Sequence, residues 1–113
     1  MRIVKKEQRN EFKNGAHCIA YEYPATDKDI NGALIVLSGR YPETGLAMNE
    51  ISKEIAYVIK GSGIVVIEGK EFAIGEGDLI FINSKEKFYW EGNMELFMPC
   101  APAWNPEQYR IIK

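Results

Sequence analysis

The chain has 113 residues, a length that suits one domain and leaves too little material for two independent cores. Apolar residues make up 46% and charged residues 27% of the sequence, proportions that exclude a disordered chain. The net charge of -2 gives no basic surface for nucleic acid, so we expect no nucleic-acid partner.

The first strand-like run follows an N-terminal segment, Met1 to Lys6, that lacks the apolar core of a signal peptide. No apolar run in the sequence is long enough to span a bilayer, so we expect no membrane partner. Cys18 and Cys100 are too few for a disulfide framework and lack CxxC spacing. These features predict a cytoplasmic protein in which both cysteines are reduced and buried.

Short apolar or alternating runs, each closed by a turn signal, recur along the whole chain. In chain order the predicted strands cover residues 16–23, 33–37, 46–51, 55–59, 64–67, 71–74, 79–82, 87–90 and 94–98. Glycines separate several of these runs, as in residues 61–63 (GSG) and in Gly92-Asn93. Short strands at close spacing with glycine-rich turns predict an all-β sandwich or barrel. Residues 5–12 have at most the pattern of one short helical turn.

Two of the predicted turns have a clear chemical reason. Gly69, between two apolar runs, can take a positive φ at no steric cost, which predicts a tight hairpin at residues 68–70. Gly75 and Gly77 allow a sharp corner, and Asp78 can accept a hydrogen bond from the backbone of its own turn. We predict one domain over residues 1–113, with a core barrel over about 16–100 and an irregular tail over 101–113.

Residues 54–63, EIAYVIKGSG, resemble the first conserved block of the cupin superfamily, in which a glycine follows a glutamate after six residues. Residues 77–82, GDLIFI, are similar to the start of the second block, which opens with a Gly-Asp step. The fifteen residues between the block glycines match the shortest spacing known in microbial cupins. The resemblance covers about two thirds of the chain, from 33 to 100, and implies a double-stranded β-helix, or jelly-roll, barrel.

The sequence departs from the cupin pattern where the family places its metal ligands. The family's His-x-His pair falls on Met48 and Glu50, or on Ala47 and Asn49 if the gap is one residue longer. The histidine of the second block falls on Phe88. The resemblance therefore implies a cupin that has lost its imidazole ligands.

The remaining donors do not compensate for this loss. His17, the only histidine, lies in an early strand outside both blocks. Glu54, Glu50 and Asn49 offer only oxygen ligands, which would hold a hard cation weakly. We therefore predict no metal ion and no cofactor.

The resemblance implies that the residues replacing the metal ligands point into the barrel. Phe88 and Trp90 then share one face of their strand, with Glu54 and Asn49 as the polar groups of a mostly apolar pocket. The predicted ligand-binding residues are Tyr41, Asn49, Glu50, Glu54, Phe88, Trp90 and Trp104.

Alternative roles for these residues remain open. Phe88 and Trp90 could fill the barrel as core, and Trp104 could serve packing alone. Glu54 could lie at the barrel mouth, solvated or paired with Lys53 or Lys60.

Three functions follow from this sequence. The favoured one is metal-independent binding of a small-molecule ligand by a homodimer, since an exposed sheet edge needs covering. The second is an enzyme, either a sugar isomerase or epimerase with Glu54 or Glu50 as general base, or a metal-dependent dioxygenase. The third is a purely structural dimerisation module with a filled interior. No nucleophile with an adjacent base is recognisable, because His17 and Cys18 point to opposite faces of their strand.

Overall fold

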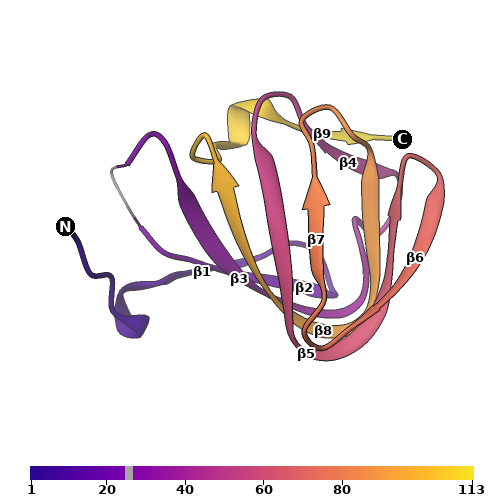
Figure 1. Ribbon diagram of the computed structural model, residues 1–113, viewed down its shortest axis with the longest axis horizontal. Helices are drawn as coiled ribbons and strands as arrows, with labels where there is room; N and C mark the ends of the chain where they lie inside the picture. Colours follow the sequence, from indigo (N-terminus) through magenta and orange to yellow (C-terminus); the bar gives the residue numbers. More distant parts are fainter. Residues whose placement is uncertain (25–26) are drawn as a thin grey trace.

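The computed structural model describes residues 1–24 and 27–113, which form a curled antiparallel sheet (Figure 1). Two short 3₁₀ helices, η1 (Lys6–Gln8) and η2 (Pro106–Gln108), flank it, and neither of these described helices has the length needed to cross a membrane. The strands are β1 (Asn10–Lys13), β2 (Cys18–Glu22), β3 (Asn31–Tyr41), β4 (Leu46–Asn49), β5 (Lys53–Ile67), β6 (Lys70–Gly75), β7 (Leu79–Ile82), β8 (Phe88–Ala101) and β9 (Tyr109–Ile112).

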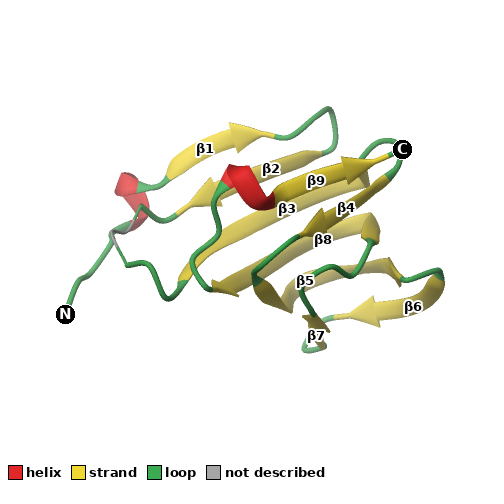
Figure 2. Ribbon diagram, turned by 90° about the horizontal axis from the view of Figure 1, so that it is seen from above, coloured by secondary structure: helices red, strands yellow, loops and turns green. Residues whose placement is uncertain are grey.

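Strand β8 is the centre of the sheet because it pairs with β3 on one side and with β5 on the other. Beyond β3 the sheet continues through β2 to β1, and beyond β5 it continues to β6 and β7. The sheet curls on itself, so that β9 of the C-terminal segment pairs with β4 at the far end of the strand order from β1 (Figure 2). This arrangement confirms the predicted all-β barrel.

The glycine-rich segments predicted as turns at 61–63 and 92–93 are bends inside continuous strands, which is a correction. Gly92 of β8 is the register partner of both Gly39 in β3 and Gly63 in β5. A Cβ atom on Gly92 would lie 2.6 Å from the Cα of Gly63, and Gly92 has a φ of 146°. Glycine is needed here because three backbones approach closely where the sheet curls. Glycine also marks turns, so the sequence alone did not distinguish a bend within a strand from a turn between strands.

The other predicted turns are confirmed. Glu68 and Gly69 have φ values of 49° and 79°, as a two-residue hairpin between β5 and β6 requires. Gly77 has a φ of 89°, and the Asp78 carboxylate accepts a hydrogen bond of 2.7 Å from the Gly75 amide.

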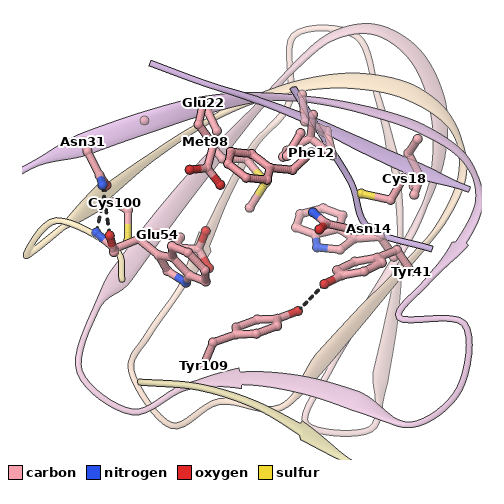
Figure 3. A pocket seen from close by; sticks show the side chains of 18 of the residues that line it. Phe12, Asn14, Cys18, Glu22, Asn31, Tyr41, Glu54, Met98, Cys100 and Tyr109 are labelled. Atoms are coloured by element: carbon pink, nitrogen blue, oxygen red, sulfur yellow. Dashed lines mark hydrogen bonds between the residues drawn. The ribbon is translucent and has the colours of Figure 1, made fainter. Parts of the chain in front are cut away.

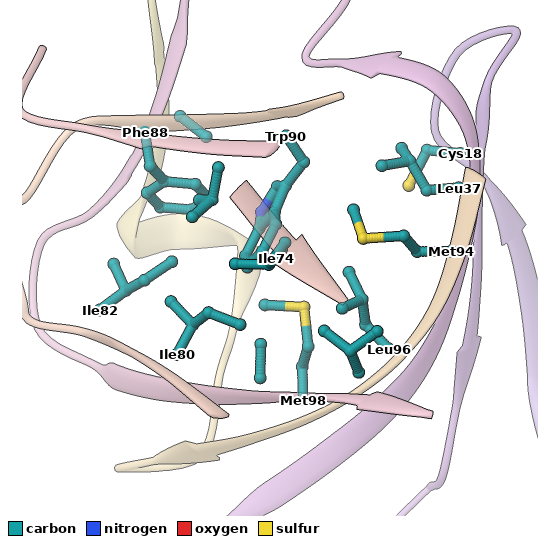
Figure 4. Packing of buried hydrophobic residues seen from close by; sticks show 14 residues of the cluster. Cys18, Leu37, Ile74, Ile80, Ile82, Phe88, Trp90, Met94, Leu96 and Met98 are labelled. Carbon is teal, nitrogen blue, oxygen red and sulfur yellow. The ribbon is translucent and has the colours of Figure 1, made fainter. Parts of the chain in front are cut away.

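Alternation along β5 and β8 builds one apolar core (Figure 4). In β8 the side chains of Phe88 and Trp90 are buried, and Tyr89 between them is only half-buried. The same alternation returns from Met94 to Cys100, where every second side chain is buried. The core is packed mainly with the buried side chains Val58, Val65, Ile74, Ile80, Ile82, Phe88, Trp90 and Leu96. Burial of these side chains fixes the register, because a slip by one residue would expose the whole set.

Both ends of the chain differ from the prediction. The tail is not irregular throughout, because β9 pairs with β4 from Leu46↔Ile112 to Asn49↔Tyr109. Helical structure near the N-terminus is limited to η1, and residues 10–13 form β1, so the sheet begins before residue 16. Both strands are only four residues long, and β9 depends on a partner distant in sequence, which local sequence patterns do not reveal.

Candidate functional site

A cavity of about 490 Å³ opens inside the barrel (Figure 3). Strands β2, β3 and β8 supply most of its wall, β5 contributes Glu54, and the C-terminal segment contributes Trp104 and Tyr109. The wall is mainly apolar and aromatic, with a small number of polar groups directed inward. This size and composition are those of sites for small organic ligands.

Glu54 is the carboxylate at the centre of the site. Its backbone pairs with Ile82 of β7 and Cys100 of β8, and its side chain shares an inward face with Ala56 and Val58. The side-chain amide of Asn49 donates a hydrogen bond to Glu54 Oε1. The Asn49 carbonyl oxygen in turn accepts a hydrogen bond of 2.9 Å from Trp104 Nε1. Glu54 is therefore held by a chain of two hydrogen bonds that ends in the C-terminal segment.

Burial strongly affects the ionisation of Glu54. Loss of solvent raises its pKa to about 7, and the hydrogen bond from Asn49 opposes this effect only in part. A carboxyl group with a pKa near neutrality is able both to release and to accept a proton at physiological pH.

A pair of tyrosines forms a second polar feature of the cavity. The hydroxyl groups of Tyr41, at the end of β3, and Tyr109, at the start of β9, lie 2.7 Å apart. The Tyr109 ring also packs edge-on against Trp104, with ring centroids 5.6 Å apart. Burial raises the pKa of both tyrosines, so their hydroxyls are neutral donors and acceptors at physiological pH.

The structure brings most of the predicted ligand-binding residues together. The cavity is lined by Tyr41, Glu54, Phe88, Trp90 and Trp104. Asn49 is buried behind this wall, where it contacts both Glu54 and Trp104.

Glu50 lies outside the cavity. It follows Asn49 at the end of β4, so alternation turns it outward, and its carboxylate stands 3.9 Å from Arg110 Nε. The alternative ion pair of Glu54 with Lys53 or Lys60 is not formed within the described residues.

Sequence reasoning missed Tyr109 and Glu22 as cavity residues. Glu22 lies on the same face of β2 as Cys18 and Ala20, so the alternation of the first predicted strand contained the signal. Tyr109 had no comparable signal, because its strand was not predicted and is placed by pairing with β4.

The donor atoms around the cavity do not fit the metal site that is common in cupins. Within residues 1–24 and 27–113, no cluster of three or more His, Cys, Asp or Glu side chains is suited to hold a metal ion. His17 is exposed and lies directly before β2, outside the cavity wall. Burial raises the pKa of Cys18 and of Cys100 to about 11, so both thiols are neutral at neutral pH in the metal-free protein.

Comparison with known proteins assigns the family. The family model described as "Cupin domain" matches residues 42–98, half of the chain. The match includes β5 with Glu54 and most of β8, the strands that carry the centre of the cavity. The chain therefore belongs to the cupin family.

One curated relative is the uncharacterized protein MJ1618 of Methanocaldococcus jannaschii, which is 29% identical over 75 residues. That match covers 63% of this chain and spans 60% of the relative's length.

Solved structures share the fold at lower identity. Pac13, described as "a unique nucleoside dehydratase", has a TM-score of 0.91 at 19% identity and covers 100% of this chain and 92% of its own. The polyketide cyclase RemF of Streptomyces resistomycificus has a TM-score of 0.74 at 18% identity, covering 100% of this chain and 86% of its own. An RmlC-like cupin of Shewanella frigidimarina has a TM-score of 0.75 at 16% identity and covers 91% of this chain and 92% of its own.

Proposed function

We propose that this cupin binds a small organic molecule in the barrel cavity and that it does so without a metal ion. The observation that carries the proposal is the cavity of about 490 Å³ with aromatic walls and one inward carboxyl group, Glu54. Such a site buries most of a small ligand against apolar surface and orients it through a few polar contacts. The cavity also argues against a filled barrel that serves only for assembly.

The fold relatives support a ligand that contains a ring. Structures of Streptomyces Pac13 variants contain uridine, and RemF is a polyketide cyclase. The faces of Trp104 and Tyr109 in the cavity wall suit contact with a flat ring. Uridine is therefore a reasonable first probe for this cavity.

Methionine methyl groups offer a direct test of binding. Met98 lines the cavity, whereas Met48 is absent from its wall, so ¹³C-methyl-methionine NMR distinguishes the two locations. We expect uridine or an indole compound to shift the Met98 signal in a saturable way and to leave Met48 in place. Ala33→Trp, which places a large ring in the cavity wall, should abolish the effect. If every ring compound leaves Met98 unmoved, the proposal is wrong.

General acid–base catalysis is a second candidate function, and the combination of Glu54 with the tyrosine pair favours it. The Glu54 carboxylate could take a proton from a bound substrate and return it at a neighbouring atom, while a tyrosine hydroxyl donates a hydrogen bond to the developing negative oxygen. The test is deuterium incorporation from D₂O into a bound ring compound. Wild type should exchange the proton, and Glu54→Gln should bind the compound without exchange.

Metal independence rests on the chemistry of the donors in the cavity. Glu54 is engaged by the Asn49 amide, and both cavity thiols are protonated at neutral pH. We expect elemental analysis of protein purified without added metal to find less than one tenth of an equivalent of Fe, Mn, Ni or Zn. A stoichiometric amount of any of these metals would overturn this part of the proposal.

We further propose that the protein is a homodimer. The outer face of β5, β7 and β8 carries exposed apolar side chains in adjacent register, with Tyr57 beside both Leu79 and Phe97 and with Phe81 next to Ile55. Contiguous exposed apolar surface of this kind is typical of an interaction site.

We also propose that the protein acts in the cytoplasm. Its two cysteines are free and buried, as expected for a protein that folds under reducing conditions. Tagging the protein and following it through cell fractionation tests this assignment, and recovery in an extracellular fraction would contradict it.

A further inference from the structure

The cavity wall has an unbalanced set of charges. Two carboxyl groups, Glu22 from β2 and Glu54 from β5, line the cavity, and no lysine, arginine or histidine is among the described residues that do so. In Figure 3 both carboxyl groups are drawn on the wall of the same pocket, with Met98 beside Glu22. The interior therefore presents negative charge without a positive partner from the protein.

The two carboxyl groups are poorly satisfied within the described residues. Glu54 accepts one hydrogen bond from a neutral amide, and the Glu22 side chain makes no hydrogen bond or ion pair. Burial raises the pKa of Glu54, and partial burial raises that of Glu22, which is only half-buried. A buried carboxylate is stabilised most by a nearby positive charge, and this wall supplies none.

Basic side chains near the barrel are engaged by other groups and do not line the cavity. The Arg9 guanidinium stacks on the ring of Tyr21, 4.6 Å from its centroid, and lies 5.7 Å from the ring centroid of Tyr23. Arg40 donates hydrogen bonds to the carbonyl groups of Pro42 and Gly45. Lys53 is adjacent to Glu54 in sequence, but alternation exposes it on the opposite face of β5.

Aromatic side chains provide a second reason for favouring a positive ligand. Trp90, Trp104 and Tyr109 line the same cavity as the two carboxyl groups. The face of an aromatic ring attracts a cation, and the attraction is stronger when the site is shielded from water. An anion would instead face two carboxyl groups and several ring faces.

We infer that the cavity selects organic cations, namely ring compounds that carry a protonated amine, over matching neutral and anionic compounds. The ring packs against the aromatic wall, and the ammonium group lies within reach of Glu54 and Glu22. The inference rests on the proposed binding function and adds to it the charge of the ligand. It excludes phosphorylated and carboxylated ligands from this cavity.

The test uses three indole compounds of similar size: tryptamine, tryptophol and indole-3-acetate, which are cationic, neutral and anionic at pH 7.5. Calorimetric titration of the full-length protein should give an affinity for tryptamine roughly tenfold or more above that for tryptophol, with no measurable binding of indole-3-acetate. Glu54→Gln and Glu22→Gln should each lower the affinity for tryptamine by roughly threefold to tenfold and change that for tryptophol by less than about twofold.

Glu71→Gln is the matched control, since it removes one exposed carboxylate on β6 that does not line the cavity. It should leave the preference for tryptamine intact, which separates a local effect from a change in net charge. Thermal unfolding of each variant checks that it is folded. The Glu54→Gln variant retains a carbonyl oxygen for the Asn49 amide, so we expect it to fold.

Between pH 6 and pH 8 the affinity for tryptamine should rise as Glu54 ionises. The titratable groups facing Glu54 are Tyr41, Tyr109 and Cys100, and burial raises the pKa of all three, so they stay neutral in this range. The charge selection alone is overturned if the three compounds bind with equal affinity. It is also overturned if Glu54→Gln and Glu22→Gln leave the preference for tryptamine over tryptophol unchanged. Failure of all three compounds to bind overturns the binding function together with it.

Discussion

Glu54 links the chemistry of the cavity to the stability of the fold. Its pKa rises from 4.5 to about 7 on folding because the side chain is buried. The folded protein therefore binds the Glu54 proton more tightly than the unfolded chain does. The contribution of Glu54 to stability is fully present below pH 4.5 and is lost progressively as the pH rises to about 7.

The first prediction follows from this linkage. Between pH 4.5 and pH 8, the free energy of unfolding of wild type should fall relative to that of Glu54→Gln by on the order of 3 kcal/mol. Urea denaturation of both proteins across this range measures the difference. A difference that does not change with pH would show that Glu54 is solvated, as in the barrel-mouth alternative.

At the scale of strands, the three glycines in register at residues 39, 92 and 63 set the curvature of the sheet. A side chain on Gly92 would meet the backbone of β5, since a Cβ there lies 2.6 Å from both Ser62 O and Gly63 Cα. Close backbone approach of this kind cannot relax by turning a flexible side chain.

The second prediction is that Gly92→Ala destabilises the protein by about 3 kcal/mol or more, because a Cβ atom clashes with backbone and the φ of 146° is strained for alanine. Gly75→Ala is the control, since a Cβ at Gly75 meets nothing within 4 Å and should change stability by less than about 1 kcal/mol. Chemical denaturation compares the two. Equal stability of the two variants would contradict this account of the curl.

Gln108 attaches the C-terminal segment to the barrel. Its side-chain carbonyl accepts hydrogen bonds from the amides of Ile51 and Ser52, and its amide donates to Ser52 Oγ. These contacts fix the position of Tyr109, which follows directly and lines the cavity.

The third prediction concerns this attachment. Gln108→Ala should destabilise the protein by about 2–4 kcal/mol, because it leaves the buried Ser52 amide and the Ile51 amide without their acceptor. Glu107→Ala, a neighbour whose side chain is exposed, should have little effect. Thermal unfolding measures both, and an effect no larger for Gln108→Ala would contradict the role of this residue.

The elements differed in how far the sequence could predict them. Strands with a buried face and a long alternating pattern, such as those carrying Glu54 and Phe88, were predictable from local residues. The edge strands β1 and β9 were not, since each is only four residues long, and β9 is held by β4, a partner distant in sequence. The bends at Gly61–Gly63 and Gly92 were misread, because glycine marks both a chain reversal and a close approach of strands. Tyr109 was not predicted as a cavity residue for a related reason: it belongs to the edge strand β9, which the sequence did not predict.

On the scale of the whole molecule, the outer apolar face of β5, β7 and β8 should control assembly. Phe81 is the most exposed of its apolar side chains, at 67%. As the fourth prediction, Phe81→Lys should convert a dimer to a monomer in light scattering after size-exclusion chromatography, since charge is costly at a buried interface. An exposed phenylalanine away from this face, Phe72 on β6, is the control site, and Phe72→Lys should leave the dimer intact. Wild type that is already monomeric would contradict the proposed homodimer.

The open cavity inside the barrel is the central claim of this account. Strands from most of the chain form its wall, and the C-terminal segment closes it. The most direct test is crystal diffraction from protein purified without added ligand, with anomalous data collected at the absorption edges of Fe, Mn, Ni and Zn. The account predicts an open cavity beside Glu54, with solvent or an organic molecule in it and no anomalous peak. An interior filled by Phe88 and Trp90, or a metal ion held at Glu54, would contradict it.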